Sequence, residues 1–186
     1  MALTTVDTNA ALVLIDLQKG IVGLPVAHDA TEIVRKGAEL AKAFRSKGLP
    51  VVLVNVTAPA PGRTDMGIRN FNWPENWTDL VPELEVQESD YLISKQRVGA
   101  FHGTSLDAIL KERGVTQVFL AGVATGSGVE STGRSAFDLG YHVVFVTDAM
   151  TDMRAETHQH CVERAFPRLG ETTTTVEVVE RLGATK

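Results

Sequence analysis

Short apolar runs alternate with longer amphipathic segments along most of this chain. The runs predict buried strands over residues 10–16, 50–56, 91–95, 116–123 and 142–149. Apolar residues at helical spacing predict helices over residues 29–48, 104–114, 128–140 and 154–166. A Thr-rich segment near the end of the chain predicts a short strand over 172–179 that runs into a last helical turn.

The order of these elements indicates the fold class. Strands that are apolar along their whole length and are separated by helices are typical of a parallel sheet covered on both faces. They predict an α/β fold, a doubly wound three-layer sandwich with a six-stranded, mainly parallel sheet and a Rossmann-like strand order. The length of 186 residues fits a single domain over residues 1–186.

Polar residues at the spacing of a capping box mark three of the predicted helix starts. The pairs are Asp29 with Glu32, Thr104 with Asp107, and Ser127 with Glu130. Ser127 is therefore predicted to be the N-cap of the helix over 128–140, and the N–H groups of that turn would form an anion pocket. A nucleophilic Ser127 is the rival interpretation, although "GSG" lacks the spacing of a nucleophile elbow.

The carboxyl ends of the strands are where a sheet of this kind binds its ligands. Strands are predicted to end at Asp16, at Lys95, at the turn 123–128 and at Asp148. A long irregular segment follows the strand over 50–56, and its length is typical of a lid or a binding loop. It contains Arg63, Asp65, Arg69, Trp73 and Trp77. The two tryptophans are expected to pack this loop on the body of the domain or on a neighbouring subunit.

Asp16 and Lys95 are charged residues at the ends of otherwise apolar strands. Such groups are costly to bury unless they are paired, so the two side chains are expected to meet in a partly dry cleft. Lysine would lower the pKa of the aspartate and desolvation would raise it, and the sequence leaves the net direction open. A structural salt bridge and a catalytic pair are both compatible with this pattern.

Charge and cysteine content narrow the range of partners. The 18 Lys and Arg against 23 Asp and Glu give a net charge of −5, which argues against nucleic acid or an anionic membrane. One cysteine, no signal peptide and no membrane-length apolar run indicate a soluble cytoplasmic protein. Cys161 is expected to be an inert buried residue, and His158 and His160 point to different helix faces. Neither a metal site nor a nucleotide-binding loop is expected.

Three stretches resemble the isochorismatase-like hydrolases, also called the cysteine hydrolase superfamily. "ALVLIDLQKG" is similar to the opening strand with its catalytic aspartate, and "KQRVGAFHGTSLDAIL" to the lysine strand and the segment that follows it. "LAGVATGSGVESTGRSAFDLGYHVVFVTDAM" is similar to the nucleophile turn and the next strand. The resemblance runs over nearly the whole chain.

The resemblance implies a catalytic set of Asp16, Lys95 and residue 128, where most members of the family carry a cysteine and this chain carries Gly128. It also implies a cis peptide bond between Val123 and Ala124, and substrate contacts from Phe101, Thr125, Gly126 and Ser127. A homodimer or homotetramer without a cofactor is expected. The Asp-x-His metal motif of nicotinamidases is replaced by "NVTAPAPG", so no metal is expected.

Loss of the thiol removes the cysteine through which most members of the family attack an amide carbonyl. Isochorismatases are similar to this chain in having a non-nucleophilic residue at this position, and they cleave an enol ether. We therefore expect a hydrolase for a small anionic molecule, with Asp16 as the general acid and Arg63 or Arg69 on substrate carboxylates. A glutamine expected after the second strand is missing, so the resemblance does not fix isochorismate as the substrate.

Two rival hypotheses stay open at this stage. One is hydrolysis of a C–N bond with Ser127 or an activated water as the nucleophile. The other is a small-molecule-binding protein that has lost catalysis together with the thiol. The retained Asp16 and Lys95 favour the enzyme over the binding protein.

Overall fold

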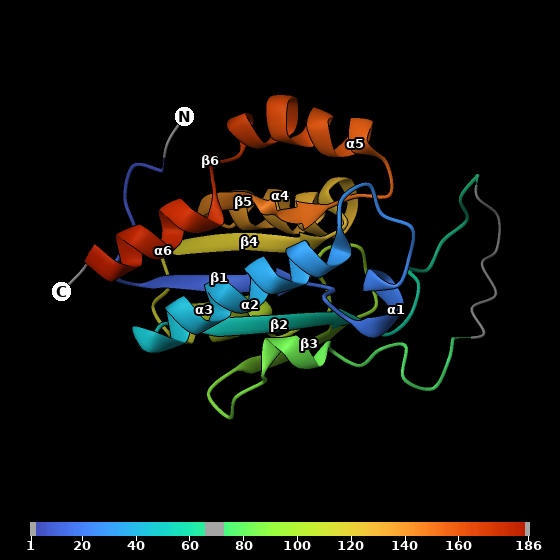
Figure 1. Cartoon of the computed structure of the whole chain (residues 1–186), viewed down its shortest axis with the longest axis horizontal. Helices are drawn as coiled ribbons and strands as arrows, with labels where there is room; N and C mark the ends of the chain where they lie inside the picture. Colours follow the sequence, from blue (N-terminus) through green and yellow to red (C-terminus); the bar gives the residue numbers. More distant parts are fainter. Residues whose placement is uncertain (1–2, 66–72, 185–186) are drawn as a thin grey trace.

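The computed structural model of the protein describes residues 3–65 and 73–184. Its six strands form one sheet in the order β3-β2-β1-β4-β5-β6, and neighbouring strands are parallel throughout (Figure 1). The strands are β1 (Ala10–Ile15), β2 (Val51–Val56), β3 (Tyr91–Lys95), β4 (Gln117–Val123), β5 (His142–Thr151) and β6 (Glu171–Thr173). The predicted fold class and strand order are confirmed.

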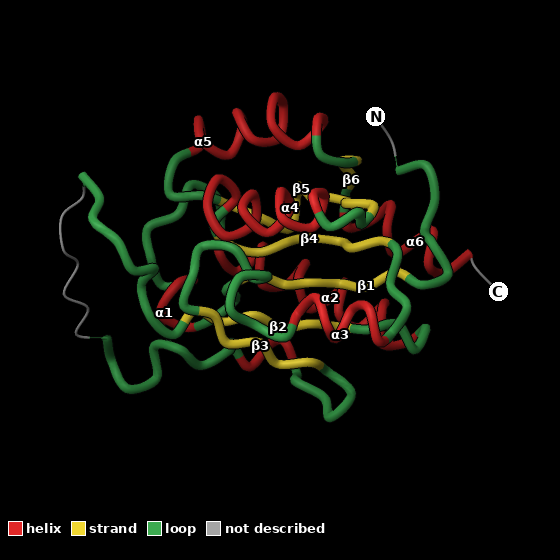
Figure 2. The backbone as a smooth tube through the Cα atoms, turned by 180° about the vertical axis from the view of Figure 1, so that it is seen from behind, coloured by secondary structure: helices red, strands yellow, loops and turns green. Residues whose placement is uncertain are grey.

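Helices cover both faces of this sheet (Figures 1 and 2). The α-helices are α1 (Lys19–Val22), α2 (Ala30–Ser46), α3 (Leu106–Glu112), α4 (Glu130–Asp138), α5 (Ala155–His160) and α6 (Thr175–Ala184). Short 3-10 helices cover Pro82–Leu84 and Phe166–Arg168, and π-helical turns cover Thr125–Val129 and Cys161–Ala165. None of the helices within the described ranges combines the length and apolarity needed to cross a membrane.

Two hydrophobic cores explain why the central strands are apolar at every position. Along β1, Ala11, Val13 and Ile15 pack into one core with α3 and α4. The alternate residues of β1 pack into the other core with α2 and α6. Because successive side chains of a strand point to opposite faces, a strand covered on both sides shows no polar alternation.

The last predicted strand is largely wrong. Only Glu171–Thr173 form β6, and the following residues form α6 instead. The carboxylate of Asp148 accepts hydrogen bonds from the backbone N–H and the hydroxyl of Thr175, and it thereby caps the first turn of α6. Thr175, Val178 and Leu182 are buried at helical spacing, which outweighs the strand preference of the threonine and valine run.

The other predicted helices are present with altered ends. Asp29 caps α2 as expected, with its carboxylate accepting the N–H of Thr31. The helix predicted from residue 104 begins at Leu106, whose N–H donates to the Thr104 hydroxyl. The helix predicted over 154–166 ends as an α-helix at His160 and continues as a π-helical turn and a 3-10 helix.

A glycine in β4 determines how closely the ends of β1 and β4 approach each other. Gly122 has φ +115°, and a Cβ atom at this position would lie 2.0 Å from the backbone oxygen of Ile15. The register between β4 and β5 also shifts between Leu120 and Gly122. The turn that follows β4 therefore lies beside the carboxyl end of β1, where Asp16 stands.

Candidate active site

Asp16 and Lys95 meet at the carboxyl edge of the sheet, as the sequence predicted. Asp16 directly follows β1 and Lys95 is the last residue of β3, with β2 between the two strands. The Nζ atom of Lys95 donates to Oδ2 of Asp16 over 2.7 Å, and the two residues are 3% and 5% exposed. This is a desolvated ion pair with a short, charge-assisted hydrogen bond.

Asp16 has one oxygen that the pair does not use. Its Oδ1 atom is buried and has no hydrogen-bond partner among the described residues. Burial raises the pKa of the Asp16 carboxyl from 3.8 to about 6, against the charge and the hydrogen bond of Lys95, which lower it. Desolvation therefore outweighs the lysine, which settles the direction that the sequence left open.

The backbone at Asp16 is itself unusual. Its φ angle is +52°, in the left-handed region that non-glycine residues seldom adopt. Such a conformation costs on the order of 1–3 kcal/mol and is found preferentially at functional sites. Both the backbone and the carboxyl group of Asp16 are thus held in states that cost free energy.

The turn after β4 differs from the predicted N-cap. The peptide bond between Val123 and Ala124 is cis, as the resemblance implied. Thr125–Val129 then form a π-helical turn that continues directly into α4, and Ser127 makes no capping hydrogen bond. Glu130 instead pairs with Arg134. The capping-box prediction was wrong because the helix begins two residues before Ser127.

The predicted anion pocket at this turn is also wrong for the N–H groups of Gly126 and Ser127. The N–H of Gly126 donates to Oδ2 of Asp152 over 2.8 Å, and the N–H of Ser127 donates to the backbone oxygen of Ala124. A carboxylate of the protein therefore already occupies the place where a substrate anion was expected.

Gly128 lies directly against the ion pair. A Cβ atom at this position would be 2.9 Å from Cγ2 of Ile15 and 3.5 Å from Oδ2 of Asp16. Any side chain at residue 128 would therefore stand beside the carboxyl group of Asp16. The glycine leaves this position without a nucleophile next to an ion pair that is fully formed.

A cavity of about 710 Å³ opens over this turn and over the ion pair. Its polar and charged lining residues are Asp16, Lys95, Arg97, Ser127, Asp152 and Thr157. Most of the remaining wall is apolar, and both tryptophans of the chain belong to it. The rings of Trp73 and Trp77 stack at 3.9 Å with an angle of 8° between their planes. Such a site suits a small molecule with an apolar body and a few polar groups.

Only some of the predicted substrate-binding residues line the cavity. Gly126 and Ser127 line the cavity. Thr125 is fully buried, and its hydroxyl is bonded to Nδ1 of His158 at 2.9 Å. Phe101 packs in the core and stacks on Tyr141, away from the cavity lining. Arg63 is exposed and does not line the cavity, and Arg69 lies outside the described residues.

Three cavity residues were missed or assigned another role by the sequence analysis. Arg97 and Asp152 follow strands β3 and β5 by two residues and one residue, so the rule that ligands bind beyond strand ends could have indicated them. Trp77 was expected only to pack the loop. Its indole lies over Gly20, where a Cβ atom would come within 2.1 Å of the ring. The loop is held in place by buried Gln18, which bonds to the backbone of Val56 and Trp77.

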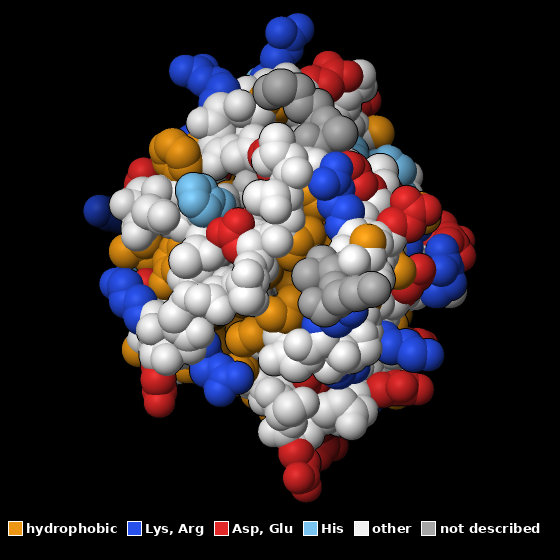
Figure 3. All heavy atoms as spheres, turned by 90° about the vertical axis from the view of Figure 1, so that its left-hand side faces the viewer, with side chains coloured by type: hydrophobic (Ala, Val, Ile, Leu, Met, Phe, Trp, Pro, Cys, Tyr) orange, Lys and Arg blue, Asp and Glu red, His pale blue; other side chains and the backbone are white. Residues whose placement is uncertain are grey.

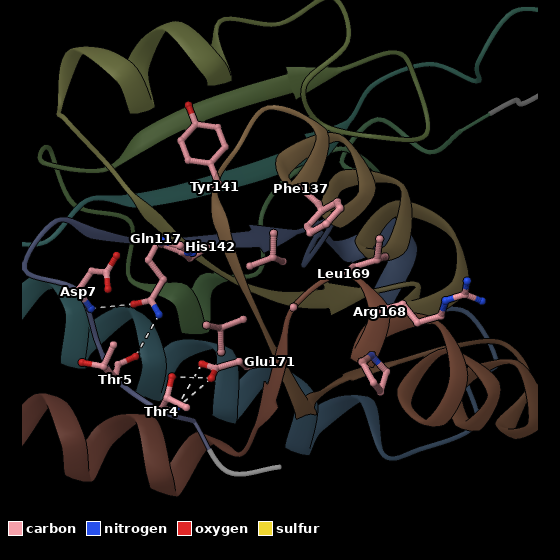
Figure 4. Close-up of a pocket in the computed structure, with 14 residues that line it drawn as sticks. Thr4, Thr5, Asp7, Gln117, Phe137, Tyr141, His142, Arg168, Leu169 and Glu171 are labelled. Carbon is pink, nitrogen blue, oxygen red and sulfur yellow. Dashed lines mark hydrogen bonds between the residues drawn. The ribbon is translucent and has the colours of Figure 1, made fainter.

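A second cavity, of about 440 Å³, lies towards the amino ends of β4 and β5 (Figure 4). Several of its polar groups are paired with one another: Glu171 accepts from Thr4, and Gln117 bonds to the backbone of Thr5 and Asp7. Figure 3 shows this end of the molecule, where charges of both signs surround apolar side chains in a shallow hollow. The residues that line this second cavity include no reactive group comparable to Asp16.

The described side chains provide no metal site. In residues 3–65 and 73–184, no group of three or more His, Cys, Asp or Glu side chains is placed to hold a metal ion. Cys161 is buried, and burial together with a hydrogen bond to Glu130 raises the pKa of its thiol to about 12. A thiol in this state is a poor nucleophile.

The sheet, the buried ion pair and the adjoining cavity define an α/β protein with a candidate small-molecule site at the carboxyl edge of its sheet. Comparison with known proteins narrows this class. Residues 10–177 match the isochorismatase domain, and the chain belongs to the isochorismatase family of hydrolases.

Relatives over the full length support this assignment. The isochorismatase family protein YwoC of Bacillus subtilis is 40% identical over 182 residues, which cover 94% of each chain. A solved structure of an isochorismatase family protein from Burkholderia thailandensis has a TM-score of 0.93 and 38% identity, over 97% of this chain and 98% of that one. A shorter stretch of 70 residues is 40% identical to the ureidoacrylate amidohydrolase RutB of Agrobacterium fabrum, over 38% of this chain and 31% of that protein.

Proposed function

We propose that the protein hydrolyses the enol ether of a small carboxylate-bearing molecule, with Asp16 as the general acid and without a covalent intermediate. The observation that carries this proposal is the Oδ1 atom of Asp16, which is buried and unpartnered and belongs to a carboxyl group with a pKa of about 6. Near neutral pH such a group can both hold and release a proton. Because residue 128 is a glycine, there is no thiol at this position to form a thioester intermediate.

The proton balance of the reaction can be written from these residues. Oδ1 of protonated Asp16 delivers its proton to the terminal carbon of the C=C–O group, which gives an oxocarbenium ion. Water adds to the cationic carbon and returns a proton to Asp16. The resulting hemiketal breaks its C–O bond and releases a carbonyl compound and an alcohol, with one water consumed in total. A carboxyvinyl ether would release pyruvate.

Lys95 supports this chemistry through its hydrogen bond to Oδ2. The bond fixes the orientation of the carboxyl group, so that the proton resides on Oδ1. Arg97 lines the same cavity, and its exposed guanidinium is available to the carboxylate of the substrate. The apolar wall with Trp73 and Trp77 would limit the water that reaches the oxocarbenium ion.

Hydrolysis of a C–N bond is the second candidate, favoured by the stretch similar to ureidoacrylate amidohydrolase RutB. In this reaction ionised Asp16 would take a proton from the attacking water. The version with Ser127 as nucleophile has less support, because no hydrogen bond joins Ser127 to His158, whose Nδ1 is bonded to Thr125. The two candidates require opposite protonation states of Asp16.

The proposal is tested with a panel of carboxyvinyl ethers, amides and carbamates, following pyruvate and ammonia separately. Enol-ether cleavage predicts pyruvate without ammonia, and loss of its release in Asp16→Asn. Ammonia release that depends on Asp16 would favour the second candidate instead. Full pyruvate turnover in Asp16→Ala would refute the acid role. Binding without any product across the panel would favour a protein that has lost catalysis.

A further inference from the structure

The cavity contains a second buried carboxylate, which the proposed reaction does not use. Asp152 follows β5 directly, is 7% exposed and lines the cavity. Its Oδ2 atom accepts the N–H of Gly126 over 2.8 Å, and its Oδ1 atom lies 3.5 Å from the N–H of Arg154. Among the described residues, no lysine or arginine forms an ion pair with it.

Asp16 and Asp152 flank the same turn. A Cβ atom at Gly126 would be 3.4 Å from Oδ2 of Asp152, and one at Gly128 would be 3.5 Å from Oδ2 of Asp16. The two glycines are separated by one residue. Both carboxylates also line the same cavity, so one small molecule on this turn can contact Asp16 and Asp152 together.

The charges in the cavity are unevenly balanced. The ammonium group of Lys95 is bonded to Asp16 over 2.7 Å, and it forms no ion pair with Asp152. Arg97 is exposed, and its Nη1 atom donates to the backbone of Gln96. His158 is close enough to interact with Asp152, but burial and the neighbouring His28 lower its pKa and favour the neutral ring. Among residues 3–65 and 73–184, no cationic side chain is therefore paired with the carboxylate of Asp152, and a buried carboxylate without such a partner is costly unless a ligand compensates it.

We propose that Asp152 binds a hydrogen-bond donor of the substrate, an ammonium or another N–H group, and so selects for amine-bearing substrates. This inference rests on the proposed function for the reaction at Asp16. It extends that function by assigning the opposite end of the same molecule. The substrate class is then a small enol ether with a carboxylate at its reacting end and an N–H donor at its far end.

A purely structural role for Asp152 would also use its bond to Gly126. Asp152→Asn separates the two roles, because the amide oxygen can still accept the N–H of Gly126 while the negative charge is lost. Asp148→Asn is the matched control. Asp148 lies on β5 and is paired with Lys36, but it does not line the cavity.

Binding can be measured without turnover. Both tryptophans of the chain line the cavity, so their fluorescence reports occupancy, and calorimetry gives an independent value. The probes are the ortho, meta and para isomers of aminomethylbenzoate. Each is compared with the toluate anion that carries a methyl group at the same ring position. The members of a pair differ only in the ammonium group. At least one isomer is expected to bind roughly tenfold or more tightly than its methyl counterpart, as befits a charge-assisted hydrogen bond.

Asp152→Asn is expected to abolish this preference, and Asp148→Asn to retain it. The inference is overturned if no isomer is preferred in the wild-type protein, including the case in which none binds. It is also overturned if the preference survives Asp152→Asn. Because no reaction is followed, these outcomes are independent of whether Asp16 cleaves an enol ether.

Discussion

The most informative perturbation is a titration of Asp16 with and without Lys95. Burial raises the pKa of its carboxyl group to about 6, while the charge and hydrogen bond of Lys95 lower it. Lys95→Met removes both lowering effects. A neighbouring cation lowers the pKa of an aspartate by about 1–3 units, so the variant should titrate about 1–3 units higher than the wild-type protein.

The same value sets the expected dependence of catalysis on pH. With a pKa of about 6, roughly nine tenths of Asp16 is protonated at pH 5 and roughly one tenth at pH 7. For a general acid, kcat/KM should therefore fall about tenfold per pH unit above pH 6. A general base in C–N hydrolysis would give the opposite slope, with activity lost below pH 6.

The assay is carbon-detected NMR of the aspartate carboxyl carbons, with Asp16→Asn to assign the resonance. Asp107 serves as an internal reference, because its hydrogen bonds with Lys111 and Tyr141 hold its pKa below 3.8. A midpoint for Asp16 close to that of Asp107 would show that burial does not dominate. A lower midpoint in Lys95→Met would contradict the assignment of Lys95 as the partner that lowers it.

Two further predictions concern the cavity. In a Cys161→Ala background, Gly128→Cys should introduce a thiol beside Asp16 that iodoacetamide alkylates much faster than Cys161 of the wild-type protein, as followed by mass spectrometry. Gly128→Cys and Gly128→Ala should each lose about 1–3 kcal/mol of stability in urea unfolding, because the new Cβ atom of either variant must displace Cγ2 of Ile15. A thiol at residue 128 that does not react with iodoacetamide would contradict the placement of this residue in the cavity. Arg97→Gln should raise KM for a carboxyvinyl ether about tenfold, whereas exposed Arg63→Gln should leave it within about twofold, and equal effects would show that Arg97 does not face the substrate.

The sequence predicted the strands β1 to β5 well because they are dictated by burial. A strand covered on both faces must be apolar throughout, and β1 and β4 are buried at every position. The charged residues at the ends of β1 and β3 stood out against that background and indicated the ion pair. Residue 128 was recognised through the family resemblance, since a glycine in a turn carries no chemical signal of its own.

The errors arose where long-range contacts decide the outcome. Ser127 has the spacing of a capping residue, but Asp152 satisfies the N–H of Gly126, and that partner is 26 residues away. Phe101 follows the lysine strand as the family motif requires, yet its ring packs against Tyr141 in the core. The helix α6 begins at Thr175 because the carboxylate of Asp148, on strand β5, accepts the N–H of that residue. No local pattern contains these contacts.

The sequence also left open whether Asp16 and Lys95 form a structural salt bridge or a catalytic pair, and stability distinguishes the two. Because the pKa of Asp16 is raised from 3.8 to about 6, the contribution of this carboxyl group to folding stability is fully present below pH 3.8, and about 3 kcal/mol of it is lost as the pH rises through 6. The left-handed backbone at Asp16 adds a further cost. Asparagine, like aspartate, adopts this conformation more readily than most residues, so Asp16→Asn adds no new backbone strain. A pair that costs this much does not stabilise the fold.

We therefore expect the double variant Asp16→Asn with Lys95→Met to be more stable than the wild-type protein at about pH 8, by about 1–4 kcal/mol in urea unfolding, as for other buried ion pairs replaced by neutral residues. Asp16→Asn alone should be less stable by about 3–5 kcal/mol, because it leaves Lys95 charged and without its partner. The advantage of the double variant should shrink as the pH falls below about 6, where the wild-type carboxyl becomes neutral. A double variant that is less stable at every pH would instead identify the pair as a structural salt bridge and leave the cavity without its acid.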